Sequence, residues 1–248
     1  MNDDLGVPPL LDLAGGDLEA IGARIDVPRY DRSALTRSIV HLGVGGFHRA
    51  HLAAYVDELC RRGHTGWSIV GSGVTPHDVA MADALNPQHG LYTLIVRGAS
   101  GTRVRVIGSI VHYVLAADER RELVAKLADP DVKIASLTIT EGGYPVDDSS
   151  GDFLPDQPAP AFDVLVDALA RRRDDGSGPI TVLSCDNVIG NGETARRSVL
   201  GTAERRQPSL VSWIESSVAF PNGMVDRITP VTTESDREWL RSRHGVID

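Results

Sequence analysis

The chain has 248 residues, of which 42% are hydrophobic, 24% charged and 5% aromatic. This length suffices for one large domain or two small ones. Asp and Glu outnumber Lys and Arg by 34 to 25, so the formal net charge is −9. An acidic chain repels polyphosphate and anionic lipid, which argues against nucleic acid or a membrane as the main partner. The composition also excludes a disordered, collagen-like or coiled-coil protein.

The N-terminus and the cysteines predict a cytoplasmic protein. Residues Met1–Asp4 are acidic and lack the basic and apolar regions of a signal peptide. No run reaches the roughly 20 apolar residues that span a bilayer. Cys60 and Cys185 are the two cysteines, and their separation fits neither a zinc motif nor a disulfide framework.

Residues 1–38 are weakly patterned, because pairs such as Pro8-Pro9 and Gly15-Gly16 interrupt them. We expect this segment to be an N-terminal extension that packs on a larger core. We place that core, a dinucleotide-binding domain, at residues 39–248.

The first ordered elements form a strand, a glycine turn, a helix and a second strand. A short apolar run at residues 38–42 ends in Gly43. Apolar side chains then recur at helical spacing over residues 48–62, and a second apolar run covers residues 67–70.

A hairpin and a helix are predicted next. Residues 91–97 and 103–114 are rich in β-branched and aromatic side chains and are separated by glycines, which predicts an antiparallel hairpin. Asp118 is expected to cap a helix that ends near Ala128, before Pro130.

The remaining segments alternate between strand and helix. They are a strand at 133–139, a loop at 142–160, a helix at 162–170, a strand at 179–184 and a helix at 193–206. The Arg171–Arg173 run suits the C-terminal end of a helix better than a phosphate site. This alternation predicts an α/β fold with a mainly parallel sheet, covered on both faces, into which the antiparallel hairpin is inserted.

Residues 43–51 follow the first strand and open the helix, which favours a dinucleotide-binding glycine loop over a merely structural turn. Gly43 allows a tight turn, and Gly45 lets backbone N–H groups approach a pyrophosphate at the helix N-terminus. His48 stands where the third glycine of G-x-G-x-x-G would be, so the motif is incomplete. Arg49 is either a phosphate ligand or a surface helix residue.

Neither a ribose-binding acid nor a metal site is evident near this loop. The acid usually follows the glycines by about 20 residues. No Asp or Glu lies between Glu58 and Asp78, so the choice between NAD and NADP stays open. His41, His48 and His51 have no Glu or Cys nearby to complete a ligand set, and no metal is expected.

Three later segments carry polar residues at strand ends or turns. Asn187 ends a strand, and its amide either donates to an oxygen that gains charge or caps the next helix. Residues 138–144 end another strand and are equally ambiguous. In residues 220–230 an Asp226–Arg227 pair follows a Pro-Asn-Gly turn, and its default interpretation is a structural ion pair.

Together these segments resemble the mannitol dehydrogenase family, the polyol-specific long-chain dehydrogenases, and its mannitol 2-dehydrogenase branch in particular. The string Phe-Pro-Asn-x-Met-Val-Asp-Arg-Ile-Thr-Pro at residues 220–230 is close to the family signature. Residues 39–51, 136–144 and 184–187 match other characteristic stretches in the expected order. The motifs are specific, and the resemblance covers roughly residues 27–233.

The resemblance implies a Rossmann-like fold and the NAD-dependent interconversion of D-mannitol and D-fructose without a catalytic metal. It implies that Asn187 stabilises the alkoxide and that Val225 and Asp226 lie beside the nicotinamide and the substrate. It also implies a cofactor loop made of Val40, His41, Leu42, Gly43, Val44, Gly45, Gly46, Phe47, His48, Arg49, Ala50 and His51.

The chain departs from the family pattern in one respect. The family carries its base in a Lys-x-x-x-x-Asn-x-x-His motif on a second, mostly helical domain. Here the motif is absent, and neither Lys126 nor Lys133 fits it. The resemblance therefore implies a cofactor domain that is inactive alone, its C-terminal catalytic domain missing or separate. The alternatives are a reductase for sugar acids such as fructuronate and a non-catalytic nucleotide-binding remnant.

Overall fold

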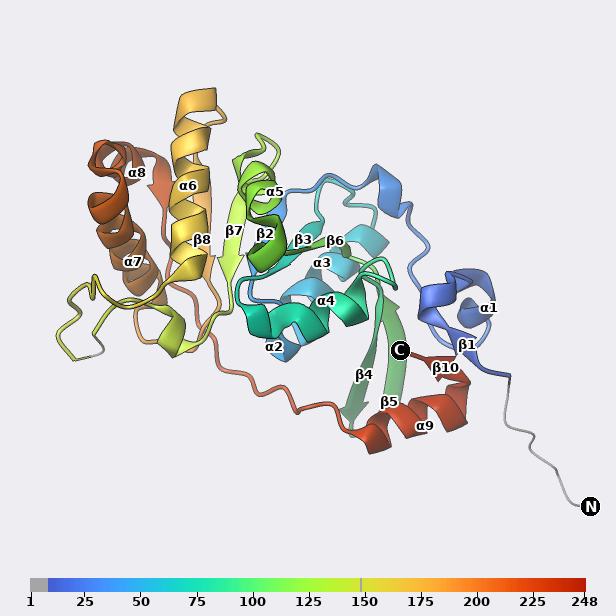
Figure 1. The fold of residues 1–248 in the computed structure, drawn as a ribbon. Coiled ribbons are helices and arrows are strands. Elements are labelled where there is room, and N and C mark those ends of the chain that lie inside the picture. Colours follow the sequence, from blue (N-terminus) through green and yellow to red (C-terminus); the bar gives the residue numbers. More distant parts are fainter. Residues whose placement is uncertain (1–8, 148) are drawn as a thin grey trace, which may run out of the picture.

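A central layer of parallel strands with helices on both sides dominates the computed structural model, which describes residues 9–147 and 149–248 (Figure 1). Met1–Asp4, Pro8 and the rest of residues 1–8 lie outside the described residues. Within the described ranges, no helix is long and apolar enough to cross a membrane.

The strands and helices alternate through most of the chain. The strands are β1 (Leu11–Asp12), β2 (Ile39–Leu42), β3 (Ile69–Gly73), β4 (Tyr92–Gly98), β5 (Gly101–Ile107), β6 (Ile110–Leu115), β7 (Ile134–Leu137), β8 (Ile180–Ser184), β9 (Val218–Ala219) and β10 (Val246–Ile247). The helices are α1 (Leu18–Gly22), α2 (Gly46–Ala50), α3 (Leu52–Arg61), α4 (Val79–Leu85), α5 (Ala116–Ala128), α6 (Pro160–Asp175), α7 (Asn191–Arg206), α8 (Val211–Ser217) and α9 (Glu234–His244).

The central sheet is parallel throughout, in the order β6-β3-β2-β7-β8-β9. Every residue of β2 is buried, because helices cover both faces, and this explains why the strands are short apolar runs without alternation. The predicted α/β fold, with its mainly parallel sheet and its antiparallel hairpin β4–β5, is confirmed.

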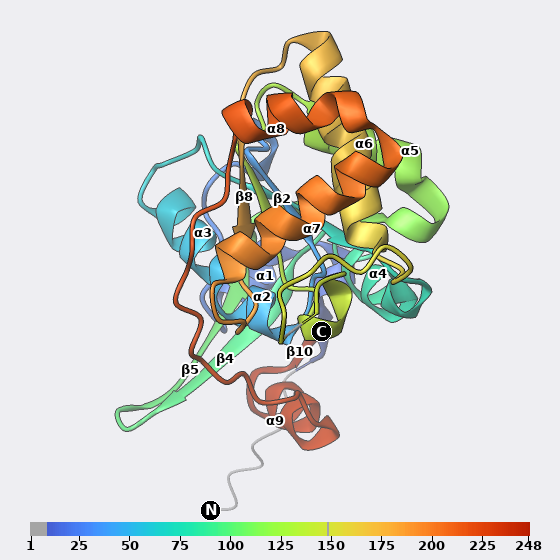
Figure 2. The same cartoon turned by 90° about the vertical axis from the view of Figure 1, so that its left-hand side faces the viewer.

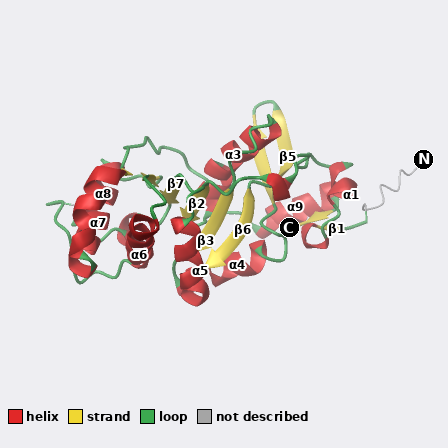
Figure 3. Cartoon of the chain, turned by 90° about the horizontal axis from the view of Figure 1, so that it is seen from above, coloured by secondary structure: helices red, strands yellow, loops and turns green. Residues whose placement is uncertain are grey.

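Two apolar clusters cover the two faces of the sheet. Helices α5, α6 and α7 supply one cluster, in which Phe162, Leu165 and Leu169 are fully buried. Helices α3 and α4 supply the other, together with β6 and the ends of the hairpin. Figure 3 shows α3 and α5 on opposite sides of the sheet.

The second strand of the predicted hairpin is divided in the structure. Residues 101–107 form β5 and pair with β4, whereas residues 110–115 form β6 and pair in parallel with β3. Gly108 and Ser109 separate them. A Cβ on Gly108 would lie 2.7 Å from the Pro28 ring, so the chain turns where only glycine fits. A single run of β-branched residues gives no signal of this division.

The predicted cap of the next helix is wrong. Helix α5 begins at Ala116 and not at Asp118, and its N-cap residue is Leu115. The carboxylate of Glu119 accepts the Leu115 N–H at 3.3 Å, and Glu119 itself has a non-helical backbone (φ −123°, ψ 33°). Strand β6 continues into α5 without a loop. The acid that accepts the Leu115 N–H is therefore Glu119, one residue after the predicted cap Asp118.

The described part of residues 1–38 packs beside the C-terminal elements. Leu13 and Ile21 are fully buried in a third cluster with Leu240 of α9 and Val246 of β10. Strand β1 pairs with β10 in parallel, which brings the first and last described elements together (Figure 1).

Arg172 occupies the place where α5 and α6 end. Its side chain is buried and lies in the Arg171–Arg173 run that closes α6. Its guanidinium donates to the carbonyl oxygens of Leu127, Asp129, Ser177, Gly178 and Pro179 at 2.8–3.3 Å. One cation thus serves carbonyls at the end of α5 and in the loop that follows α6.

We expect Arg172→Met to destabilise the fold by about 2–4 kcal/mol, because a buried carbonyl that loses its partner costs about 1–3 kcal/mol and several lose theirs here. Arg171→Met is the matched control. Arg171 forms an exposed pair with Asp175, so its loss should cost less than about 1 kcal/mol. Urea unfolding of both variants measures the difference, and equal losses would contradict this role for Arg172.

Candidate functional site

The order of the strands creates a switch point between β2 and β7. From β2 the chain proceeds outward through β3 to β6, and from β7 it proceeds the other way through β8 to β9. In open α/β sheets ligands bind at the carboxyl ends of the strands where the direction reverses. Here the loops that begin at Gly43 and at Thr138 occupy this position.

Gly43 and Thr138 touch across the switch point. Gly43 has φ +90°, and a Cβ on it would lie 2.2 Å from the Thr138 carbonyl oxygen. The Thr138 hydroxyl donates to the Gly43 carbonyl at 2.6 Å, and the Gly43 N–H donates to the Ser72 carbonyl at 2.8 Å. Glycine is required at position 43 by both its backbone conformation and this close approach.

The next glycine, Gly45, has open space around it, whereas a Cβ on Gly46 would contact the Thr229 methyl group at 3.7 Å. Gly45 is extended (φ −123°, ψ −168°) and precedes the first turn of α2 at Gly46. A Cβ on Gly45 would meet nothing closer than the Gly43 carbonyl oxygen, at 3.9 Å. Neither backbone strain nor crowding requires glycine at position 45, so a side chain there would project into open space.

Arg49 is a partly exposed residue of α2 whose side chain contacts other elements of the fold. Its guanidinium contacts the Met81 sulfur at 2.8 Å and lies 5.9 Å from the centre of the Tyr92 ring. The Tyr92 hydroxyl donates to the Arg49 carbonyl at 2.6 Å. Arg49 therefore packs the short helix α2 against α4 and β4.

His41 and His48 form a buried stack beneath α2. Both are fully buried, with ring centres 3.6 Å apart and planes 15° apart. The His41 ring nitrogens contact the hydroxyls of Ser136 and Thr138, each at 2.8 Å. Neither ring nitrogen of His48 has a hydrogen-bond partner among the described residues. The stack fills the space where a third glycine would bring helix and strand together.

Burial keeps both rings neutral. It lowers the pKa of His41 to about 3, and it lowers the pKa of His48 well below its usual value, with Arg49 and His41 acting in the same direction. His51 lies apart and shares a 3.2 Å hydrogen bond with the Thr229 hydroxyl. Across the described ranges, no group of three or more His, Cys, Asp or Glu is arranged to hold a metal ion.

Asp186 joins the carboxyl ends of β7 and β8. The residue is 8% exposed, and its carboxylate accepts the N–H groups of Ile139 and Thr140, at 3.1 and 2.9 Å, and the Tyr144 hydroxyl, at 2.7 Å. Burial raises the pKa of Asp186, although all three donors act to lower it. The preference of Asp and Asn for turns was the only sequence signal for this residue.

Thr140, which Asp186 holds, has φ +62° and ψ 165°. This region belongs essentially to glycine, and such a residue costs about 1–3 kcal/mol. A β-branched side chain makes the conformation still rarer. The strain lies at the end of β7, directly across from the glycine loop.

Asn187 is exposed and forms no hydrogen bond with any described residue. The N-cap position of α7 is Gly190, so the alternative in which Asn187 caps that helix is wrong. Asn191, which the sequence reasoning missed, has the structural role instead. Its side chain bonds both backbone groups of Gly223 at 2.9 Å, and thereby fastens residues 220–224 to the start of α7.

Residues 220–230 continue past the carboxyl ends of the strands as an irregular connection toward α9 (Figure 2). Val225 is half-buried and Asp226 is exposed. Among the described residues Asp226 and Arg227 form no ion pair, and the Arg227 guanidinium lies 5.9 Å from the Tyr55 ring centre. Neighbouring side chains of an extended segment point to opposite sides and do not meet.

An acid, Asp78, lies at the carboxyl end of β3, although none stands at the usual spacing from the glycines. Asp78 folds back on the end of β3, so that a Cβ on Gly73 would lie 2.3 Å from the Asp78 Cβ. One oxygen of Asp78 accepts the N–H groups of Val74 and Thr75 and the Thr75 hydroxyl. The usual spacing of about 20 residues after the glycines does not indicate Asp78, because a 3-10 turn at Pro76–Asp78 brings it back to the strand.

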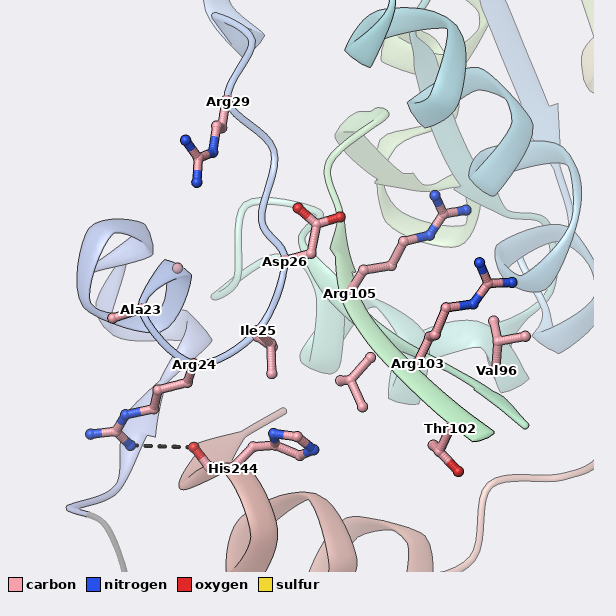
Figure 4. Close-up of a pocket in the computed structure, with 12 residues that line it drawn as sticks. Ala23, Arg24, Ile25, Asp26, Arg29, Val96, Thr102, Arg103, Arg105 and His244 are labelled. Atoms are coloured by element: carbon pink, nitrogen blue, oxygen red, sulfur yellow. Dashed lines mark hydrogen bonds between the residues drawn. The ribbon is translucent and has the colours of Figure 1, made fainter. Parts of the chain in front are cut away.

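A hollow of about 700 Å³ lies elsewhere, between α1, the hairpin and α9 (Figure 4). Four arginines line it, but Figure 4 shows that they do not converge. Arg24 points to the His244 carbonyl at 3.4 Å, whereas Arg103 and Arg105 extend toward the other side. Arg105 lies 3.5 Å from Glu58. The switch point is therefore the stronger candidate.

Comparisons with known proteins identify the family of this chain. Residues 37–242 match the sequence family described as "Mannitol dehydrogenase Rossmann domain". The mannitol 2-dehydrogenase of Neosartorya fischeri is 44% identical over 243 residues, 92% of this chain and 48% of that protein. The mannitol 2-dehydrogenase of Cereibacter sphaeroides is 46% identical over 234 residues, 89% of this chain and 49% of that protein.

Two solved structures share the fold. The Pseudomonas fluorescens mannitol 2-dehydrogenase, in a ternary complex with NAD and D-mannitol, has a TM-score of 0.89 at 41% identity over 95% of this chain and 51% of its own. A D-sorbitol dehydrogenase in substrate-free form has a TM-score of 0.85 at 39% identity, over 93% of this chain and 51% of its own. The chain spans about half the length of the curated relatives it matches.

Lowering the pH is expected to destabilise the fold through the two stacked histidines. Below about pH 6.5 the unfolded chain binds protons on both rings and the folded chain does not, so stability is present above that pH and is lost as the pH falls toward the folded pKa values, about 3 for His41. Each ring contributes a loss of about 1.4 kcal/mol per pH unit.

Urea unfolding of His48→Phe at about pH 7.5 and about pH 5.5 measures this effect. Phenylalanine keeps a ring in the stack but does not titrate, so the variant should lose about 1.4 kcal/mol less than the wild type over this interval. His64→Phe, at an exposed histidine, is the control and should keep the wild-type dependence. An identical pH dependence in the wild type and His48→Phe would mean that His48 is not held neutral.

Proposed function

The chain belongs to the mannitol dehydrogenase family, and we propose that it binds NAD(H) at the carboxyl ends of β2 and β7, as the cofactor domain of a polyol dehydrogenase. The observation that carries this proposal is the open space above Gly45, at the switch point of a doubly wound sheet. The activity that fits best is the interconversion of D-mannitol and D-fructose by hydride transfer.

The glycine loop fits the pyrophosphate of NAD in shape and in polarity. The backbone from Gly43 to Gly46 turns without side chains beyond Val44, which is buried. N–H groups at the start of α2 would donate to the phosphate oxygens. Asp78, at the end of β3, offers a carboxylate oxygen toward an adenosine ribose, and a carboxylate there would oppose the extra phosphate of NADP. The nicotinamide supplies the hydride acceptor when the cofactor is bound.

On the substrate side, the proposal gives Asn187 the role of a donor to the developing alkoxide. Its amide is exposed and unengaged at the end of β8, as a group that binds a substrate oxygen must be. A donor positioned for the charged state lowers the barrier more than it strengthens ground-state binding. In the same proposal Val225 and Asp226, on residues 220–230, border the nicotinamide and the polyol.

Neither lysine of the chain lies where a base is needed. Lys133 precedes β7 and donates to the Pro130 carbonyl, at the amino end of the sheet. Lys126 is near the end of α5, beside Glu122. Alcohol oxidation needs a group that accepts the hydroxyl proton. We therefore propose that the base is contributed by a further polypeptide segment, corresponding to the other half of the relatives' length.

Two alternatives are weaker. A sugar-acid reductase of the same family would need a cation for the substrate carboxylate. The cation on residues 220–230 is Arg227, and its guanidinium lies against the Tyr55 ring. The two structural relatives act, by their names, on polyols. A purely nucleotide-binding protein would bind NADH and never contribute to turnover.

We expect Gly45→Val to weaken NADH binding at least tenfold, because its side chain would fill the space that the pyrophosphate needs. Its melting temperature should stay near that of the wild type, since the Gly45 backbone is extended and uncrowded. Gly66→Val is the matched control: that glycine also has open space around it, but it lies away from the switch point. Calorimetric titration with NADH measures both, and equal affinity in Gly45→Val and the wild type would remove the loop from the proposal.

The 248-residue chain alone is expected to oxidise D-mannitol with NAD hardly above background. General acid–base assistance is typically worth about 10²–10⁴-fold, and no lysine reaches the site. Formation of NADH, followed by absorbance at saturating mannitol and then sorbitol, measures this. Rapid turnover would show that the base lies within these residues.

A further inference from the structure

We infer that Asp186 is the positioning residue of the nicotinamide half of the proposed cofactor site. Its carboxylate ties the end of β7 to the end of β8 and holds Thr140 in a backbone conformation that it would otherwise leave. This inference rests on the proposed function, and it adds a residue to which neither the family resemblance nor the glycine loop assigns a role.

All the hydrogen bonds that the Asp186 carboxylate accepts come from one segment of the chain. One oxygen accepts the Thr140 N–H, and the other accepts the Ile139 N–H and the Tyr144 hydroxyl. The Tyr144 hydroxyl also lies 2.7 Å from the Ser184 hydroxyl, which fixes the ring relative to β8. All three donors belong to the segment that leaves β7, whereas Asp186 belongs to the segment that leaves β8. The carboxylate is therefore a clamp between two neighbouring loops.

The conformation of Thr140 indicates what the clamp is for. A non-glycine residue at φ +62° and ψ 165° persists only where its surroundings impose the conformation, and such residues gather at ligand sites. The two N–H groups that Asp186 accepts are those of Thr140 and of the residue before it. Loss of the carboxylate would allow this peptide to rotate to an unstrained angle, and Glu141 would move with it.

The position of the clamp in the sheet determines which part of the cofactor it affects. A doubly wound sheet binds a dinucleotide with one mononucleotide over each half, and the adenosine lies over the half that carries the glycine loop. Strands β7 and β8 belong to the other half, over which the nicotinamide would lie. Asn187 follows Asp186 directly, so the residue that holds Thr140 is also next in the chain to the amide proposed to face the substrate. Asp186 itself is buried and acts through these neighbours.

Two ligands separate this positioning role from a general effect on folding. NADH and ADP-ribose share the adenosine and the pyrophosphate, but ADP-ribose lacks the nicotinamide. Asp186→Asn replaces one acceptor oxygen with an NH₂ group that faces N–H donors. We expect this variant to bind NADH at least tenfold more weakly than the wild type and to bind ADP-ribose within twofold of it.

A second substitution tests whether Thr140 transmits the effect. Glycine adopts the angles of Thr140 without strain, so Thr140→Gly in the Asp186→Asn background should recover at least threefold of the lost NADH affinity. If Asp186→Asn does not fold, Tyr144→Phe replaces it. That variant keeps both backbone contacts of Asp186 and should lower the ratio of NADH affinity to ADP-ribose affinity by about two- to fivefold.

Calorimetric titration of the 248-residue chain with both ligands gives the result. A wild type that binds neither ligand overturns the proposed function, and the inference with it. A wild type that binds both, beside an Asp186→Asn variant that loses both equally or loses neither, overturns the inference alone. So does a double variant that recovers no NADH affinity.

Discussion

The close approach of Gly43 to the Thr138 carbonyl is the constraint on which the site depends. The two residues follow the two central strands, and their contact leaves no room for a Cβ on Gly43. Since β2 and β7 are adjacent, parallel and fully paired, the two loops must part immediately above this contact. One becomes the glycine loop and the other becomes the strained segment at Thr140. The open space at Gly45 thus belongs to one of two loops whose starting points the strand pairing fixes.

The two stacked histidines form a polar layer near this contact, and burial keeps both rings uncharged. His41 contacts Ser136 and Thr138 of β7, and His48 lies on His41. An uncharged, polar, flat pair of rings can be buried there, whereas a charged one would lose its hydration. The stack lies between α2 and β2. His48 therefore fills the position at which the usual loop motif has its third glycine.

The sequence predicted the elements that local periodicity controls. Strand, turn and helix around Gly43 and the strand before Asn187 fell within a few residues of the observed bounds, because apolar spacing decides them. Apolar periodicity does not predict contacts between residues that are distant in the sequence. Nothing in the spacing indicates that His48 stacks on His41, that Asp186 accepts from Thr140, or that a threonine has a glycine-like φ. The position of Asp78 was not predicted for the same reason, because a turn and not a fixed sequence interval brings it to β3.

The two sides of the site differ in how firmly they are held. The glycine loop rests on buried strands, whereas residues 220–230 are fastened at Asn191 and at His51 and are otherwise mostly exposed. Ile189, Met224 and Ile228 have 93–101% of their surface exposed. Burial of each would contribute about 1.5–3 kcal/mol. A surface that covered them would also order the segment that carries Val225 and Asp226. In the proposed enzyme, the polypeptide that brings the base would thus complete the substrate wall by the same contact.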